Sequence, residues 1–326
     1  MTTPPILPPP AGIWCPAITL FHPATSALDL PSQAKYYAHL SRSGLTGLLI
    51  LGTNAEPLLL SRTERRSLLQ LAKESCPPGF PLMAGISGHS TAQVLEYLDD
   101  AVECGYQWVL VLPPGYFPGL TTGRVVDEFF GDVATKAGEK GVGTVVYNFP
   151  GVCNGVDLSS EDVVRLARGN GGVVGVKLTC GSVAKMVRIV GELEGEKGFA
   201  TFGGQSDFLI GGLSVGGSGC IAAFANVIPR TAVKIWELWG EGRREEALKL
   251  HRVAALAEGF VKQGGVAAVK YAAGWMQVGR AGVEEVEGKV RMRRPYGDLP
   301  EERKKAIREG LREVKEIEDA LWAASR

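Results

Sequence analysis

The sequence predicts an α/β fold, a (β/α)8 TIM barrel with a C-terminal helical appendage. Between residues 12 and 226, eight short β-type runs alternate with longer segments of helical periodicity. The runs are almost continuously apolar, which is typical of parallel strands buried on both faces. After residue 229 the pattern is wholly helical. We therefore expect an extended N-terminal arm over 1–11, a barrel over 12–229 and a helical segment over 230–326.

The expected strands, in chain order, are GIWCPAITL, GLLILG, LMAGIS, WVLVLP, GTVVYN, VVGVKL, TFGG and GSGCIAAF. Eight strands in a chain of this length favour a closed barrel. An open doubly wound sheet is the rival arrangement, and it would be expected to carry a glycine fingerprint after its first strand. The segment there, FHPATSALDL, contains no glycine.

The expected helices between the strands include SRTERRSLLQLAKES, STAQVLEYLDDAVECG, TTGRVVDEFFGDVATKAGEKG and SSEDVVRLARG. Several open on Ser or Thr with an acidic residue three positions later, which indicates a helix start. In the C-terminal run EERKKAIREGLREVKEIEDALW, apolar residues from Ile307 to Leu321 follow one stripe. We expect the charges of this run to form a solvated face.

Composition excludes several classes of partner. The chain has 326 residues, with 35 basic and 35 acidic side chains and no net charge, so neither nucleic acid nor a membrane surface is expected as a partner. The N-terminus lacks the features of a signal or transit peptide, which predicts a cytoplasmic location. Six scattered cysteines without a CxxC pair indicate reduced thiols, and a zinc site is not expected.

Active sites of such barrels lie at the C-terminal ends of the strands. The polar candidates there are Thr19, Thr53, Asn54, Glu56, Tyr116, Tyr147, Asn148, Lys177, Ser206 and Asp207. The four histidines are dispersed, and no group of His, Asp and Glu has the spacing of a metal site. We therefore expect no catalytic metal.

Lys177 is the sharpest candidate, because it is the one charged residue in the apolar run GGVVGVKLTCG. An apolar setting disfavours a charged ammonium, and a neutral amine attacks ketones to form a Schiff base. The structural alternatives are a lysine that snorkels to solvent at the barrel rim or one that pairs with a buried carboxylate. Lys270, in AAVKYAAGWM, is a second lysine in apolar company, and its expected place on a helix suggests snorkelling.

Two further motifs suit a Schiff-base site. Tyr147 ends the preceding strand, where its phenol could carry protons for an adjacent amine; without that lysine it would be an aromatic cap. The segment GTNAE offers hydroxyl, amide and backbone N–H donors that suit a carboxylate.

The order of GTNAEPLLLSRTE, PPGYF, VVYNFPG, GVKLT, GGQSD and GGSGCIAAFANVIP resembles the dihydrodipicolinate synthase and N-acetylneuraminate lyase superfamily of pyruvate-type aldolases. The resemblance covers about residues 12–229. It implies that Lys177 forms the Schiff base with pyruvate or a 2-oxo acid and that Tyr147 shuttles protons. It also implies a relay from Thr53 to Tyr116, which in this family reaches a neighbouring subunit.

The resemblance further implies that Thr53 and Asn54 hold the pyruvate carboxylate and that Gly204 and Ile221 line the same pocket. Members are commonly homotetramers and need neither metal nor organic cofactor. The expected substrates are pyruvate or another 2-oxo acid and a small aldehyde.

Departures from the family pattern point to one branch. GTNAE replaces the GTTGE of dihydrodipicolinate synthases, and Asn54 resembles 4-hydroxy-2-oxoglutarate and 2-keto-3-deoxy sugar-acid aldolases. The arginine that usually follows YNxP is absent, although Arg124 or another base could supply that clamp. We expect an aldolase acting on a 4-hydroxy-2-oxo acid first, and condensation of pyruvate with aspartate semialdehyde second.

Two departures and two glycine-rich segments leave other functions open. Leu178 stands where an acidic residue often follows the lysine, with Thr179 as a substitute hydrogen-bonding group, and Ala55 could strain its turn. These departures keep a non-catalytic family member in consideration. GGQSD and GGLSVGGSGCI suggest a non-covalent phosphate-binding barrel as another alternative.

Overall fold

The computed structural model describes residues 5–193, 196 and 198–324. Within them, eight strands close into a barrel in chain order, β1 to β8, so the predicted (β/α)8 fold is confirmed. The strands are β1 (Gly12–Pro16), β2 (Gly47–Ile50), β3 (Leu82–Gly85), β4 (Trp108–Val111), β5 (Gly143–Asn148), β6 (Val173–Leu178), β7 (Ala200–Gly203) and β8 (Gly219–Ile221). Each strand is buried along its length, as the continuous apolar runs predicted.

Helices follow the strands and continue to the C-terminus. They are α1 (Leu30–Ser41), α2 (Arg62–Ser75), α3 (Thr91–Glu103), α4 (Gly123–Glu139), α5 (Ser160–Gly169), α6 (Val183–Glu192), α7 (Leu209–Leu213), α8 (Pro229–Gly240), α9 (Arg244–Lys262), α10 (Gly265–Ala273), α11 (Val286–Lys289), α12 (Glu301–Gly310) and α13 (Arg312–Ala323). Capping boxes at Ser61 and Ser159 start α2 and α5, which confirms the helix-start pattern. No helix in the described part of the chain is long and apolar enough to cross a membrane.

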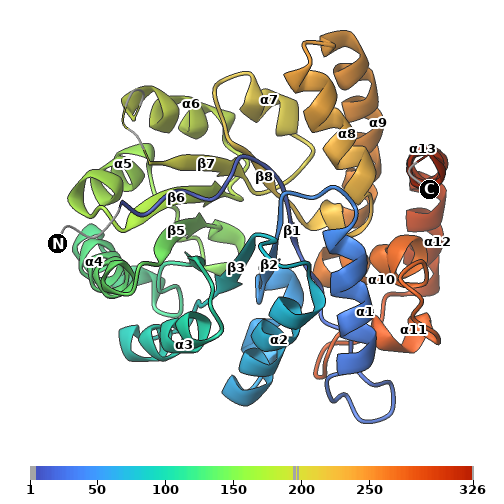
Figure 1. Cartoon of the computed structure of the whole chain (residues 1–326), viewed down its shortest axis with the longest axis horizontal. Coiled ribbons are helices and arrows are strands. Elements are labelled where there is room, and N and C mark those ends of the chain that lie inside the picture. The colour runs from blue at the N-terminus through green and yellow to red at the C-terminus, as the bar shows by residue number, and fades with distance from the viewer. Residues whose placement is uncertain (1–4, 194–195, 197, 325–326) are drawn as a thin grey trace. The chain divides into compact units, whose positions relative to one another are not determined.

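The chain divides into two compact units. The first comprises the described residues up to Ala11 with Pro81–Gly204 and Gly211–Cys220, and the second comprises Gly12–Phe80, Gln205–Ile210 and the described residues from Ile221 onward. In the first unit, β5, β6 and β7 lie side by side with α4, α5 and α6 beside them (Figure 1). The strands contribute fully buried valines to the core, such as Val145 of β5 and Val176 of β6.

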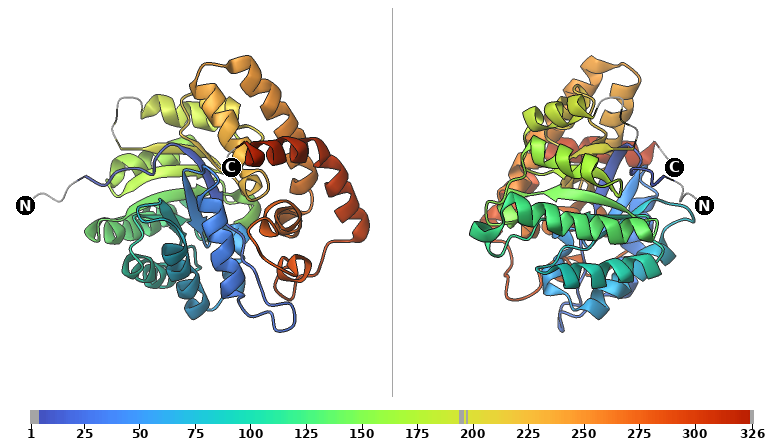
Figure 2. Two further views of the ribbon diagram at one scale, coloured as in Figure 1. Left: turned by 45° about the vertical axis from the view of Figure 1, so that its right-hand side comes forward. Right: turned by 90° about the vertical axis from the view of Figure 1, so that its left-hand side faces the viewer.

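In the second unit the C-terminal helices pack together. Figure 2 shows α12 and α13 beside α8, α9 and α10. Ile307, Leu311 and Val314 of the predicted stripe are fully buried. The expectation that all charges of this run are solvated is wrong at Glu318, which is fully buried and accepts hydrogen bonds from Thr231 Oγ1 (2.7 Å) and Trp322 Nε1 (2.9 Å).

Candidate active site

Lys177 and Tyr147 lie opposite each other in the first unit. Parallel pairing of β5 with β6 places Tyr147 in register with Lys177, so their side chains leave the sheet on the same face. Both residues are buried, at 3% and 2% exposure, and Lys177 Nζ lies 4.2 Å from the centre of the tyrosine ring. Among the described residues, Nζ makes no hydrogen bond or ion pair. Lys177 therefore neither snorkels nor pairs with a carboxylate.

Thr179 and Gly204 meet next to this lysine. The Thr179 amide donates to the Asn148 carbonyl (2.9 Å), while its buried hydroxyl has no hydrogen-bond partner among the described residues. Within the described residues, Thr179 therefore makes no hydrogen bond to the Lys177 amine. A Cβ atom at Gly204 would lie 1.9 Å from that hydroxyl. Position 204 therefore admits only glycine, and the Gly204 backbone packs directly against Thr179 at the ends of β6 and β7.

A polar network fixes the end of β5 beside Tyr147. Asn148 donates from Nδ2 to Asp157 (2.7 Å) and accepts from the Leu158 amide (3.0 Å). Lys185, at 6% exposure, donates to the same Asp157 oxygen (2.5 Å) and to the Leu158 carbonyl. This role of Lys185 was not predicted, because its partners Asp157 and Leu158 come from the segment before α5. The network holds Tyr147 by anchoring the residue that follows it.

The loop after β5 offers no charged clamp. Cys153, near the place of the arginine that is common in dihydrodipicolinate synthases, is 1% exposed, and burial raises the pKa of its thiol to about 11. Arg124 is the other candidate for a clamp. Its side chain is 85% exposed and its guanidinium pairs with Glu128 one helical turn later (2.7 Å). Neither residue presents a buried cation to an acidic substrate.

Tyr116 lies five residues beyond the end of β4, in an exposed loop. Its side chain is 66% exposed, and its ring makes edge contacts with Phe117 (4.8 Å) and His89 (5.7 Å). Phe117 and Leu120 in the same loop are also exposed, at 65% and 71%. The loop therefore presents three large apolar side chains to its surroundings.

Thr53 and Asn54 lie in the second unit, in a short 3₁₀ helix over Thr53–Ala55 directly after β2. Both are half-buried, and Thr19 Oγ1 donates to the Ala55 carbonyl (2.9 Å). The strain expected at Ala55 falls instead at Glu56, which adopts the left-handed conformation (φ 56°, ψ 43°). Alanine at position 55 is thus accommodated by the turn.

Lys270 does not snorkel, and that expectation is wrong. The residue is fully buried, and Nζ lies 2.5 Å from Oε1 of Glu56, which is itself 5% exposed. Burial lowers the pKa of the Lys270 ammonium, and Glu56 opposes that effect. The apolar helix around Lys270 predicted that its amine would extend to solvent. Instead, the carboxylate of Glu56, 214 residues earlier in the chain, compensates its charge.

Ser206 and Asp207, in the second unit, are occupied by partners of their own. The amide and the hydroxyl of Ser206 both donate to Glu258 (3.3 and 2.5 Å), and His251 Nε2 lies 2.8 Å from the Ser206 carbonyl. Asp207 pairs with Lys262 (2.6 Å). Burial raises the pKa of Glu258 to about 7. The donors that a phosphate would need at this turn already bind a carboxyl group, which argues against the phosphate-binding alternative.

Ile221, the last of the predicted pocket residues, is fully buried at the end of β8. Glu258 was missed, although a glutamate within the small apolar residues AALAEGF is a signal of burial that could have found it. Within the described residues, no cluster of three or more His, Cys, Asp or Glu side chains could hold a metal ion.

Comparison with known proteins identifies the family of the chain. The model of the dihydrodipicolinate synthetase family matches residues 9–314. A Coccidioides immitis (strain RS) protein that is 53% identical, over 96% of this chain and 98% of its own, carries a provisional name as a mitochondrial 4-hydroxy-2-oxoglutarate aldolase. The L-threo-3-deoxy-hexylosonate aldolase of Hypocrea jecorina is 33% identical over 96% of this chain and 98% of its own.

Two solved structures have the same fold. A dihydrodipicolinate synthase family protein from Coccidioides immitis superposes with a TM-score of 0.88 at 50% identity, covering 97% of this chain and 99% of the other. Escherichia coli YagE, solved in complex with pyruvate, superposes with a TM-score of 0.83 at 25% identity, covering 94% and 98%.

Proposed function

The chain belongs to the dihydrodipicolinate synthetase family and is an enzyme of this lyase and aldolase family; from this premise we propose that it cleaves a 4-hydroxy-2-oxo acid to pyruvate and an aldehyde. The nucleophile is Lys177, which forms a Schiff base with the substrate. The observation that carries the proposal is the buried pair of β5 and β6, in which the Lys177 amine faces the Tyr147 ring at 4.2 Å.

The amine of Lys177 adds to the C2 carbonyl, and loss of water gives an iminium ion. Tyr147 takes the proton of the C4 hydroxyl, and the C3–C4 bond breaks. Its electrons move to the iminium nitrogen, which leaves an enamine of pyruvate and releases the aldehyde. Protonation at C3 and hydrolysis return pyruvate and the free amine. Run in reverse, the enamine adds to an aldehyde.

The remaining residues have binding roles in this proposal. Thr53 and Asn54 hold the carboxylate next to the keto group, and Gly204 and Ile221 line the pocket. The turn at 53–56 supplies hydroxyl and amide donors, which suit an anion. The close packing of the Gly204 backbone against Thr179, where a Cβ atom would lie 1.9 Å from the hydroxyl, supports the place of Gly204 beside the end of β6.

Two substrate classes enter this proposal: a 2-keto-3-deoxy sugar acid releases a neutral, hydroxylated aldehyde, whereas 4-hydroxy-2-oxoglutarate releases glyoxylate, which carries a carboxylate. Cys153 is a buried neutral thiol and Arg124 is solvent-exposed, so neither favours a carboxylate on the aldehyde. The names of the Coccidioides and Hypocrea relatives agree with these two substrate classes. Condensation of pyruvate with aspartate semialdehyde is the second reaction to test.

We propose that the enzyme is a homotetramer, in which Tyr116 enters the proton relay of a neighbouring subunit together with Thr53. The exposed Tyr116, Phe117 and Leu120 support such a contact, because a large exposed apolar patch is unusual on a monomer. Light scattering during gel filtration measures the assembly, and Tyr116→Asp should shift it to smaller species. The cytoplasmic location remains a prediction that imaging of a tagged protein tests, since one relative is named for the mitochondrion.

A retro-aldol screen tests the proposed function. The purified enzyme is incubated with 4-hydroxy-2-oxoglutarate and with several 2-keto-3-deoxy sugar acids, and pyruvate release is measured with a coupled dehydrogenase. Condensation of pyruvate with aspartate semialdehyde is measured in parallel. We expect cleavage of at least one 4-hydroxy-2-oxo acid at a higher kcat/KM than the condensation. Condensation alone would assign the enzyme to the second reaction.

A further inference from the structure

The turn at 53–56 is held by a segment far away in the sequence. Two groups make the contacts: the three residues Arg291–Arg293, here called the strap, and Lys270. The Arg293 amide donates to Glu56 Oε2 (2.8 Å), while Lys270 Nζ binds Glu56 Oε1 (2.5 Å) and the Arg291 carbonyl (2.8 Å). Each carboxylate oxygen of Glu56 therefore has a partner supplied by the C-terminal part of the chain.

The side chain of Arg293 extends this hold to the residues after the turn. Its guanidinium donates to the Leu59 carbonyl (2.9 Å) and binds Glu64 through two nitrogens (2.8 and 2.7 Å). A two-point arginine–carboxylate bond fixes orientation as well as distance. Glu64 also accepts from the Ser61 amide at the start of α2 (2.9 Å). The hydrogen bond to Arg293 lowers the pKa of Glu64, so this carboxylate is charged at neutral pH.

Glu56 needs such an anchor, because its backbone is in the left-handed region (φ 56°). A residue with a side chain pays a steric penalty there and stays only where its surroundings hold it. The strap and Lys270 provide that hold at both carboxylate oxygens. Thr53 and Asn54 lie three and two residues before Glu56, which caps the short helix that contains them, so the position of Glu56 sets the end of that helix.

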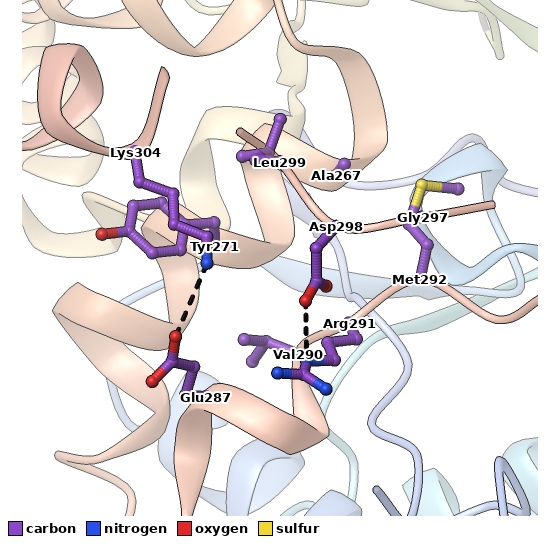
Figure 3. A pocket seen from close by; sticks show the side chains of 10 residues that line it. All are labelled: Ala267, Tyr271, Glu287, Val290, Arg291, Met292, Gly297, Asp298, Leu299 and Lys304. Carbon is purple, nitrogen blue, oxygen red and sulfur yellow. Dashed lines mark ion pairs between the residues drawn. The ribbon is translucent and has the colours of Figure 1, made fainter. Parts of the chain in front are cut away.

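The outer side of the strap borders a small pocket. Figure 3 shows this pocket, with the ion pairs Arg291–Asp298 (2.9 Å) and Lys304–Glu287 (3.5 Å) around it. The pocket measures about 20 Å³, which is room for roughly one water molecule. The Arg291–Asp298 pair ties the strap to the segment that leads into α12.

We propose that Arg293 and Lys270 are positioning residues for carboxylate recognition, and that the strap holds the 53–56 turn in its substrate-binding conformation. The proposal rests on the proposed function, since it assumes that Thr53 and Asn54 bind the carboxylate of the 2-oxo acid. It makes substrate affinity depend on a segment that does not itself touch substrate.

The test compares Arg293→Ala with Arg280→Ala. Both changes remove a partly buried arginine from an ion pair in the same unit: Arg293–Glu64 has side chains 21% and 24% exposed, and Arg280–Asp319 has 25% and 40%. Of the two side chains, only that of Arg293 binds the segment directly after the turn, at Leu59 and Glu64, while its backbone amide bond to Glu56 is kept in Arg293→Ala. We expect Arg293→Ala to raise KM for the 2-oxo acid about tenfold, which corresponds to about 1.4 kcal/mol, with kcat changed less than about threefold. Arg280→Ala should change neither constant, and Arg293→Lys should give an intermediate KM.

Hydrogen exchange of the backbone provides a readout that does not need activity. Amides of residues 53–60 should exchange faster in Arg293→Ala than in the wild type, and should exchange at the wild-type rate in Arg280→Ala. An unchanged KM, an equal rise in Arg280→Ala, or unchanged exchange of residues 53–60 would overturn the proposal. If the wild type neither cleaves a 2-oxo acid nor traps pyruvate, the proposed function fails and the role in substrate binding fails with it. Faster exchange in Arg293→Ala would then leave the strap as a purely structural anchor.

Discussion

Two buried lysines, one in each unit, illustrate opposite ways of placing an ammonium group in a protein interior. Lys270 is fully buried and compensated: Glu56 binds it at 2.5 Å and the Arg291 carbonyl at 2.8 Å. Lys177 is equally buried at 2% exposure, yet a tyrosine ring is its neighbour and its Nζ has no ionic partner among the described residues.

The presence or absence of a carboxylate partner distinguishes a structural role of a buried lysine from a chemical one. A buried ion pair keeps both groups charged and is costly to break, so such a lysine is a poor nucleophile. A buried lysine without a carboxylate gains nothing from its charge and is suited to covalent chemistry. Burial alone ranks the two lysines equally, whereas their partners differ, and this difference is the reason for proposing Lys177 as the nucleophile.

Removal of the reactive amine should have the largest effect. We expect Lys177→Ala to lower kcat/KM for 4-hydroxy-2-oxo acids by at least about 10⁴-fold, as removal of a covalent nucleophile does in other enzymes. Lys262→Ala, which removes a half-exposed lysine paired with Asp207, serves as the control and should keep most of the activity. Activity of Lys177→Ala within tenfold of the wild type would contradict the distinction between the two lysines.

Loss of the phenol beside Lys177 should come next. Tyr147→Phe keeps the ring that packs on the amine and removes the group proposed to move protons, so kcat should fall by about 10²- to 10⁴-fold. Because the nucleophile remains, the variant should still form the Schiff base, more slowly. Wild-type kcat in Tyr147→Phe would show that another group carries the C4 hydroxyl proton.

Breaking the compensated pair should act on stability. Lys270→Met leaves Glu56 as a buried charge without its lysine and should lower the free energy of unfolding by about 3–5 kcal/mol. The double variant Glu56→Gln with Lys270→Met removes that charge and should regain a large part of the loss. Denaturant unfolding of both variants measures the effect. A loss below about 1 kcal/mol in the single variant would mean that the pair is not buried in solution.

Glu258 extends the comparison to a buried carboxyl group that has a hydroxyl partner in place of a lysine. Burial raises its pKa from 4.5 to about 7, so the folded protein binds the proton more tightly than the unfolded chain does. Stability contributed by this group is therefore fully present below pH 4.5 and is lost as the pH rises toward 7. At about 1.36 kcal/mol per pKa unit, the loss is at most about 3 kcal/mol.

Unfolding of the wild type and of Glu258→Gln across that pH range measures this loss. The variant cannot ionise at position 258, so the difference in unfolding free energy between the two proteins should change with pH between 4.5 and 7. A difference that stays constant would show that Glu258 is ionised throughout in the folded protein.

The fold was predictable because its signals are local in the sequence. A buried parallel strand is a short apolar run, and a helix start is a Ser with an acidic residue three positions on, as at Ser61. The burial of Lys177 was predictable in the same way, since the run GGVVGVKLTCG shows the lysine and its apolar setting together. Its register with Tyr147 follows from parallel pairing of β5 and β6.

The burial of Lys270 and Glu318 was not predicted, because it depends on partners that are distant in the sequence. Lys270 meets Glu56 across 214 residues, and no local pattern shows whether a lysine in an apolar helix escapes to solvent or finds a carboxylate. Glu318 was assigned to a solvated face for the same reason, although Thr231 and Trp322 bind it. The roles of Thr53, Asn54, Tyr116, Gly204 and Ile221 came from family resemblance, and these roles remain predictions, as do the catalytic roles of Lys177 and Tyr147.

Borohydride reduction in the presence of pyruvate asks directly whether the buried lysine without an ionic partner is the nucleophile. The intact protein is reduced, its mass is measured and the modified peptide is sequenced. We expect a single reduced pyruvate adduct per chain, located on Lys177, and no adduct in Lys177→Ala. An adduct on Lys270, an adduct that persists in Lys177→Ala, or no adduct on the wild type would contradict the assignment of Lys177.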